Sequence, residues 1–144
     1  MTSGTGYAAA ATISGSAWAA ILAGRDPGFG LLPGDSGEYI SAAGSTVRTD
    51  GDAMVTVSWR GHSRDLYFQD GPYFRLRRGP GATVPATYSN GLAAALVDRY
   101  GRGSVGVSGP HPEAAASWYS ESGLTTDGVS LDLGYDLVEA TIKT

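Results

Sequence analysis

The sequence has no cysteine, a single lysine and only two histidines. Without cysteine the chain forms no disulfide and offers neither a thiolate nucleophile nor a zinc–thiolate site. A site that needs imidazole must use His62 or His111. We therefore expect no cofactor and no metal site.

Long hydrophobic runs are also missing. The longest, Ala17–Ala23, is far shorter than the roughly 20 residues that a membrane-spanning helix needs. The first positively charged side chain is Arg25, so the N-terminal region lacks the basic start of a secretory signal. These features predict a protein without a membrane span that is cytoplasmic, or a component of a particle assembled there.

Glycine, by contrast, is abundant, with 22 of 144 residues scattered along the chain. Such scattering is typical of many tight turns between short elements. The length fits one hydrophobic core, and we found no linker long enough to divide it. We expect a single domain over residues 1–144, with residues 1–12 as a candidate extended N-terminal arm.

Hydrophobic alternation gives the clearest local predictions. Residues 53–59 alternate cleanly and predict a strand that buries Val55, Val57 and Trp59 on one face. Segments 64–69 and 73–78 flank Asp70-Gly71-Pro72 and predict a hairpin. An odd-length loop keeps the apolar faces together, so the predicted cross-strand pairs are Phe68 with Phe74, Leu66 with Leu76, and Asp65 with Arg77.

Helical spacing and punctuation predict three short helices, over 16–23, 90–100 and 112–120, with Trp118 facing inward in the third. The remaining expectations are a loop over 28–37, weak strands over 38–42 and 45–48, a short strand over 105–107, and a strand with a bend over 129–142. Together these elements predict an α+β fold, in which an antiparallel sheet with a central Arg/Tyr-rich hairpin packs against two or three short helices.

One motif suggests chemistry. Gly34-Asp35-Ser36-Gly37 resembles the nucleophile turn of trypsin-like proteases and the Gly-Asp-Ser block of the GDSL hydrolases. In the proteases the histidine and aspartate precede the serine, whereas both histidines follow Ser36 here. The Asp-x-x-His of the GDSL family is also missing before His62 and His111. We therefore expect an ordinary turn and predict no catalytic residues.

Charge is distributed unevenly. Between Arg60 and Arg78 lie five arginines and two aspartates, whereas six acidic residues and only Lys143 follow Gly109. Arginine and tyrosine are enriched where proteins bind each other, because they combine rigid contact area with several hydrogen-bond donors. The candidate binding residues on the hairpin are Arg60, Arg64, Tyr67, Tyr73, Arg75, Arg77 and Arg78.

The sequence thus favours a non-enzymatic protein–protein interaction or assembly protein, such as a self-assembling structural or virion-type subunit. Its basic hairpin would dock an acidic protein partner or the acidic C-terminal third of another copy. Three alternatives stay open: an immunity or antitoxin-type protein, a small-ligand or glycan-binding module that uses Trp59, Tyr67 and Tyr73, and a small hydrolase that uses Ser36 or His62. The negative net charge and the scarcity of lysine argue against a nucleic-acid partner.

Overall fold

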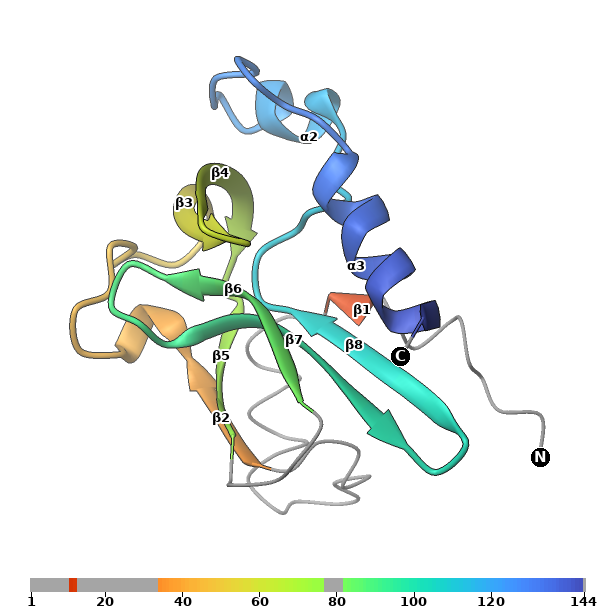
Figure 1. The fold of residues 1–144 in the computed structure, drawn as a ribbon. Helices are drawn as coiled ribbons and strands as arrows, with labels where there is room; N and C mark the ends of the chain where they lie inside the picture. The colour runs from red at the N-terminus through yellow and green to blue at the C-terminus, as the bar shows by residue number, and fades with distance from the viewer. Residues whose placement is uncertain (1–10, 13–33, 77–81, 144) are drawn as a thin grey trace.

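A computed structural model describes residues 11–12, 34–76 and 82–143 of the chain (Figure 1). The predicted helix over 16–23, most of the predicted loop over 28–37, and the candidate residues Arg77 and Arg78 lie outside these ranges.

The described residues form a sheet-dominated fold with two α-helices. The strands are β1 (Ala11–Thr12), β2 (Gly34–Glu38), β3 (Asp52–Trp59), β4 (His62–Gln69), β5 (Pro72–Leu76), β6 (Thr83–Tyr88), β7 (Ala93–Tyr100) and β8 (Gly103–Ser108). The helices are the 3-10 turn η1 (Tyr39–Ser41), α2 (Ala116–Glu121) and α3 (Asp132–Lys143). The predicted α+β class agrees with the structure only loosely, because most of the described residues belong to an antiparallel sheet and only two α-helices accompany it.

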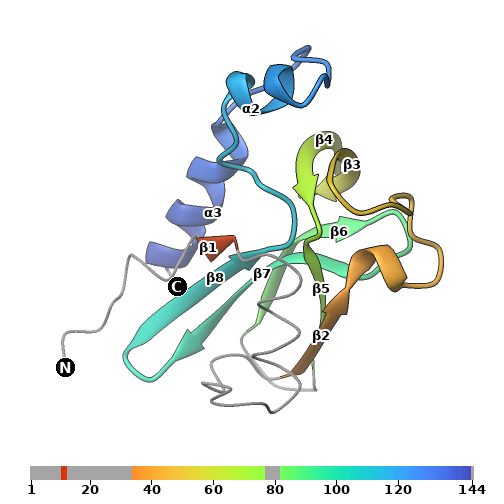
Figure 2. The ribbon, with the colours of Figure 1, turned by 180° about the vertical axis from the view of Figure 1, so that it is seen from behind.

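The strands pair in the order β1-β8-β7-β6-β3-β4, and β5 joins this sheet through β7 and also pairs with β2. Every pairing is antiparallel except that of β1 with β8. The core lies between the curled sheet and α3, and contains Val55, Val57, Trp59, Leu133 and Leu137. Seen from both sides, α3 lies over β8 at the outer edge of the molecule (Figures 1 and 2).

The strand predicted over 53–59 is confirmed as β3, with Val55, Val57 and Trp59 each buried. It joins β4 through a two-residue turn, in which Arg60 and Gly61 both have positive φ, 46° and 85°. Two successive positive φ values give the tight turn that matches the natural twist of a hairpin. The turn sets His62 opposite Trp59.

The predicted hairpin between 64–69 and 73–78 is wrong, although both segments contain strands. Phe68 and Leu66 lie opposite Ala53 and Val55 of β3, and Phe74 lies opposite Ser36 of β2. Asp65 lies opposite Thr56 and not opposite Arg77. The Asp65 carboxylate accepts a hydrogen bond from the Thr56 hydroxyl at 2.6 Å. The tight turn after β3 provides β4 with a full-length partner, so β5 extends to a different part of the sheet.

Other local predictions also need correction. The predicted helix over 90–100 is β7, and most of the predicted strand over 129–142 belongs to α3. Only Glu38 of the predicted strand over 38–42 lies in a strand, and 45–48 is not a strand. Gly34–Gly37, expected in a loop, belongs to β2. The strand over 105–107 is confirmed within β8.

The helix predicted over 112–120 is confirmed in part as α2, but its packing face is different. Trp118 is 41% exposed, whereas its neighbour Tyr119 is buried. Among the described residues, no helix is long and apolar enough to cross a membrane.

Candidate functional site

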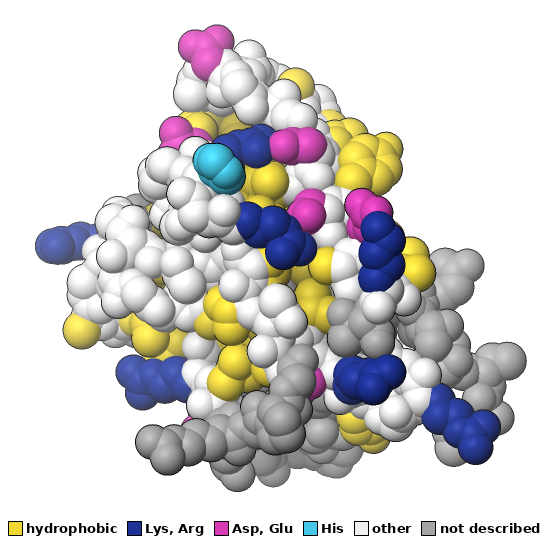
Figure 3. Space-filling model, in the orientation of Figure 1, with side chains coloured by type: hydrophobic (Ala, Val, Ile, Leu, Met, Phe, Trp, Pro, Cys, Tyr) yellow, Lys and Arg dark blue, Asp and Glu magenta, His cyan; other side chains and the backbone are white. Residues whose placement is uncertain are grey.

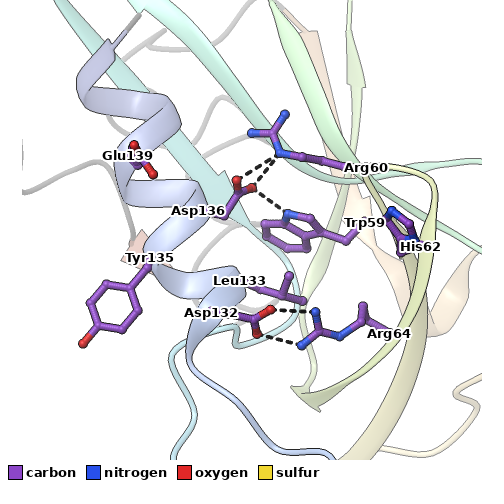
Figure 4. A pocket seen from close by; sticks show the side chains of 9 residues that line it. All are labelled: Trp59, Arg60, His62, Arg64, Asp132, Leu133, Tyr135, Asp136 and Glu139. Atoms are coloured by element: carbon purple, nitrogen blue, oxygen red, sulfur yellow. Dashed lines mark hydrogen bonds and ion pairs between the residues drawn. The ribbon is translucent and has the colours of Figure 1, made fainter.

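A cleft of about 520 Å³ lies between the β3–β4 turn and α3 (Figure 4). The strands contribute Trp59, Arg60, His62 and Arg64, and the helix contributes Asp132, Leu133, Tyr135, Asp136 and Glu139. The cleft therefore brings the start of the predicted basic hairpin beside the acidic C-terminal segment.

Asp136 connects α3 to the end of β3. Its carboxylate accepts a 2.8 Å hydrogen bond from Nε1 of the buried Trp59 and bonds of 2.8 and 3.1 Å from Nε of Arg60. The register of β3 explains why these groups meet, since Trp59 turns inward and Arg60 begins the turn. The indole N–H of the buried Trp59 ring thus keeps a hydrogen-bond acceptor.

Asp132 makes a second connection, one turn earlier in the helix. Arg64 donates from Nη1 and Nη2 to the two carboxylate oxygens, at 2.8 and 2.7 Å. This is the paired geometry in which guanidinium and carboxylate match best. The hydrogen bonds from Arg64 lower the pKa of Asp132 to about 2, and the same contact raises the pKa of Arg64.

A third carboxylate, Glu139, pairs with Lys143 one helical turn away. The three acidic side chains of α3, Asp132, Asp136 and Glu139, are therefore all neutralised by cations of the same chain. Figure 3 shows acidic and basic side chains side by side on one face of the molecule. A cleft of paired charges can hold a ligand's polar groups at its rim, but its carboxylates are already occupied as acceptors.

The arrangement around the histidines does not assemble a nucleophile and base. His62 is exposed at the β3–β4 turn, whereas Ser36 lies in β2 with its hydroxyl buried and without a hydrogen-bond partner among the described residues. His111 directs Nδ1 at Glu113, 3.0 Å away. Within residues 34–76 and 82–143, no three His, Asp or Glu side chains gather as metal ligands would.

Tyr67 was expected on an exposed hairpin face, and that expectation is wrong because the side chain is only 5% exposed. Its ring packs edge-on against Trp118 and Tyr119, and also against His111. Burial raises the pKa of Tyr67. The hydroxyls of Tyr67 and Ser122 in turn lower the pKa of Asp52.

Tyr73 and Arg75 share β5, away from the cleft. Tyr73 is half-buried, and the guanidinium of the exposed Arg75 lies 5.3 Å from the centre of its ring. Of the candidate binding residues, the structure thus brings together Arg60 and Arg64 in the cleft. It separates both from Tyr67 and from the Tyr73–Arg75 pair.

Sequence reasoning missed a second surface, the outward face of α3. Leu131, Tyr135 and Ile142 are 41%, 72% and 66% exposed, and Val138 between them is half-buried. We call these four side chains the α3 stripe. Their spacing of four, three and four residues is the signal that could have revealed it, because that spacing places side chains on one helical face.

The comparisons with known proteins add no family to this description. No protein-family model matches the chain, and no curated protein is significantly similar to it.

Proposed function

We propose that the chain is a non-enzymatic protein–protein interaction domain that binds its partner through the α3 stripe and the adjoining cleft. The observation that carries the proposal is a helix with two apolar faces. One face buries Leu133 and Leu137 against the sheet. The other leaves Tyr135 and Ile142 in water, where an isolated surface helix normally presents polar side chains.

Burial of this second face would be favourable. Each square ångström of apolar surface removed from water contributes about 25 cal/mol, and a fully buried Leu or Ile side chain contributes about 1.5–3 kcal/mol. Contiguous apolar side chains bordered by charged ones are typical of protein-binding surfaces. The stripe meets this description because Asp132, Asp136 and Glu139 run along one side of it.

The paired charges affect how a partner is recognised. Asp132 and Asp136 already hold Arg64 and Arg60, so exposed ionic contacts with a partner must compete with these bonds. Arg60 uses only Nε in its bond to Asp136, which leaves its terminal nitrogens directed toward the rim of the cleft (Figure 4). An acidic group of the partner could bind there, while the apolar stripe supplies most of the contact.

A self-assembling subunit is the first form of this proposal, and an immunity-type protein that binds a foreign partner is the second. A glycan-binding module has less support. Sugar-binding sites use the open face of an aromatic ring, whereas Trp59 and Tyr67 are 2% and 5% exposed and the half-buried Tyr73 has the Arg75 guanidinium over its ring.

Photo-crosslinking tests the proposal. A photoreactive amino acid replaces Ile142 in cells that naturally make the protein, and a matched variant carries it at Tyr100, which is 51% exposed in β7. We expect protein adducts from position 142 and few from position 100. Equal yields at both positions, or none at 142, would contradict a docking surface on α3.

A further inference from the structure

Resting on the proposed function, we propose that the partner of the α3 stripe is a second copy of this chain, bound by antiparallel packing of the two α3 helices about a two-fold axis. The stripe reads Leu131, Tyr135, Val138 and Ile142, with separations of four, three and four residues. This series is the same in both directions along the helix. A two-fold contact sets residue i of one copy against residue j of the other and j against i, so this spacing allows all four side chains to pair in an antiparallel arrangement.

The symmetry sets the register. With the axis between Tyr135 and Val138, Tyr135 lies against Val138 of the partner subunit and Leu131 lies against Ile142 of the partner subunit. Each contact then occurs twice. The larger Tyr135 side chain meets the smaller Val138, and Leu131 meets Ile142, which is of equal size. Complementary sizes let two helical surfaces interdigitate rather than leave gaps.

Leu131 takes part although it precedes the first helical residue. Its carbonyl accepts the hydrogen bond from the Tyr135 backbone N–H at 3.1 Å, as the residue that caps a helix does, so it lies directly against the first turn. The stripe therefore runs from the residue that directly precedes α3 to Ile142 near its end.

Electrostatics permits two identical faces to approach. In this pairing the flank with Asp136 and Glu139 faces the same flank of the partner, and bare carboxylates would repel each other. Here Arg60 neutralises Asp136, Arg64 neutralises Asp132, and Lys143 neutralises Glu139. Each copy thus presents an apolar stripe beside a flank with no unpaired carboxylate.

The size of the contact predicts its strength. The 12 residues of α3 extend about 18 Å, at about 1.5 Å per residue. A contact through one helix face of this length buries an area well below the roughly 800 Å² per partner that a stable interface buries. We therefore expect a weak dimer whose population rises with protein concentration.

The absence of cysteine makes the register directly testable. In a Leu131→Cys/Ile142→Cys double variant, the two positions are 11 residues apart in the sequence, or about 16 Å along the helix axis. A disulfide requires Cα atoms within about 7 Å. The two cysteines of one chain therefore cannot pair with each other, whereas those of antiparallel copies can.

We expect mild oxidation to convert the double variant to a covalent dimer much faster than either single variant, with no larger species. The single variants are matched controls, because in the antiparallel register each cysteine lies about 16 Å from its own copy. The inference would be overturned if the single variants and the double variant formed dimers at equal rates, or if polymers larger than the dimer appeared. It would also be overturned if a double variant with a native circular dichroism spectrum formed no dimer.

Sedimentation of the unmodified protein covers the case in which the double variant fails to fold. The mass should rise from one chain toward two with concentration, and Tyr135→Asp should keep it at one while Tyr100→Ser does not. A wild-type monomer at all concentrations overturns self-association. In that case the proposed function still stands if position 142 crosslinks to a different protein. If position 142 forms no adduct, both the proposed function and the self-association are wrong.

Discussion

At the scale of single residues, the most informative group is the Asp132 carboxylate. Arg64 holds the pKa of Asp132 at about 2, below the value near 3.9 expected in an unfolded chain. A lowered pKa stabilises the folded state above the unfolded pKa, and this contribution is lost as the pH falls toward 2. Because the pair is partly exposed, the contribution is about 0.2–1 kcal/mol.

Asp132→Asn should therefore remove part of the acid sensitivity. We expect the free energy of unfolding to fall less in the variant than in the wild-type protein between about pH 5 and pH 2.5. Urea titrations at both pH values give the comparison, and NMR titration of the wild-type carboxylate gives its pKa directly. A wild-type pKa near 3.9 would contradict the Arg64 contact.

Replacing two neighbouring carboxylates of α3 by alanine should lower the free energy of unfolding by very different amounts. Asp136→Ala leaves the indole N–H of buried Trp59 without its acceptor, which costs about 1–3 kcal/mol. Glu139→Ala removes only an exposed pair with Lys143 and should change stability by about 0.5 kcal/mol or less. Urea unfolding of both variants checks this, and equal losses would show that Asp136 does not anchor α3 to β3.

At the scale of elements, the strand most easily predicted was β3, because its alternation reflects one buried and one exposed face. In β7, residues Ala94 to Asp98 are all buried, so the strand has no alternation. The helical spacing came from Leu92, Leu96, Val97 and Tyr100, of which only Leu96 and Val97 belong to this buried run. Runs buried on both faces cannot be assigned by periodicity alone.

The error at α3 was the reverse. Val129, Leu131, Leu133, Tyr135 and Leu137 alternate, as in a strand, because the helix carries apolar side chains on two faces. Only the shift of phase after Leu137 indicated a helix, and it was interpreted as a bend. The cleft was hidden for the same reason, since it exists only once a helix lies beside the β3–β4 turn.

The segment that joins β8 to α2 has its own sensitive point at Gly109. A Cβ atom there would overlap the carbonyl oxygen of Pro72 and the hydroxyl of Tyr88. Those two groups form a buried 2.7 Å hydrogen bond. Overpacking together with loss of this bond should cost Gly109→Ala about 3 kcal/mol or more.

Gly61→Ala is the matched control, because nothing lies within 4 Å of an added Cβ and only its φ of 85° opposes the change. A side chain in this conformation costs about 1–2 kcal/mol. Thermal unfolding should therefore show a clearly lower melting temperature for Gly109→Ala. Similar losses in the two variants would mean that the neighbours of Gly109 move aside.

At the scale of the whole molecule, the uneven charge is plain in the sequence, but the contacts that these charges make within the chain were not visible there. The basic segment and the acidic C-terminal third are complementary, and the sequence suggested that they join separate copies. The fold places Arg60 and Arg64 against Asp136 and Asp132 of the same chain. Charge complementarity does not distinguish contacts within a chain from contacts between chains, because that depends on topology.

This difference reverses the expected effect of salt on association. If copies were held by exposed complementary charges, ions would screen the attraction over about 10 Å at 0.1 M and the assembly would dissociate. Packing of the α3 stripe instead removes apolar surface from water, and sulfate strengthens such burial. We therefore expect the mass measured by light scattering to stay equal or rise from low salt to high sulfate. A dimer at low salt that becomes a monomer at high salt would assign the contact to exposed charges. Exposed arginines that lie outside the cleft in the described part of the chain, Arg99 and Arg102 around the β7–β8 turn among them, would then be replaced by Ser as the next measurement.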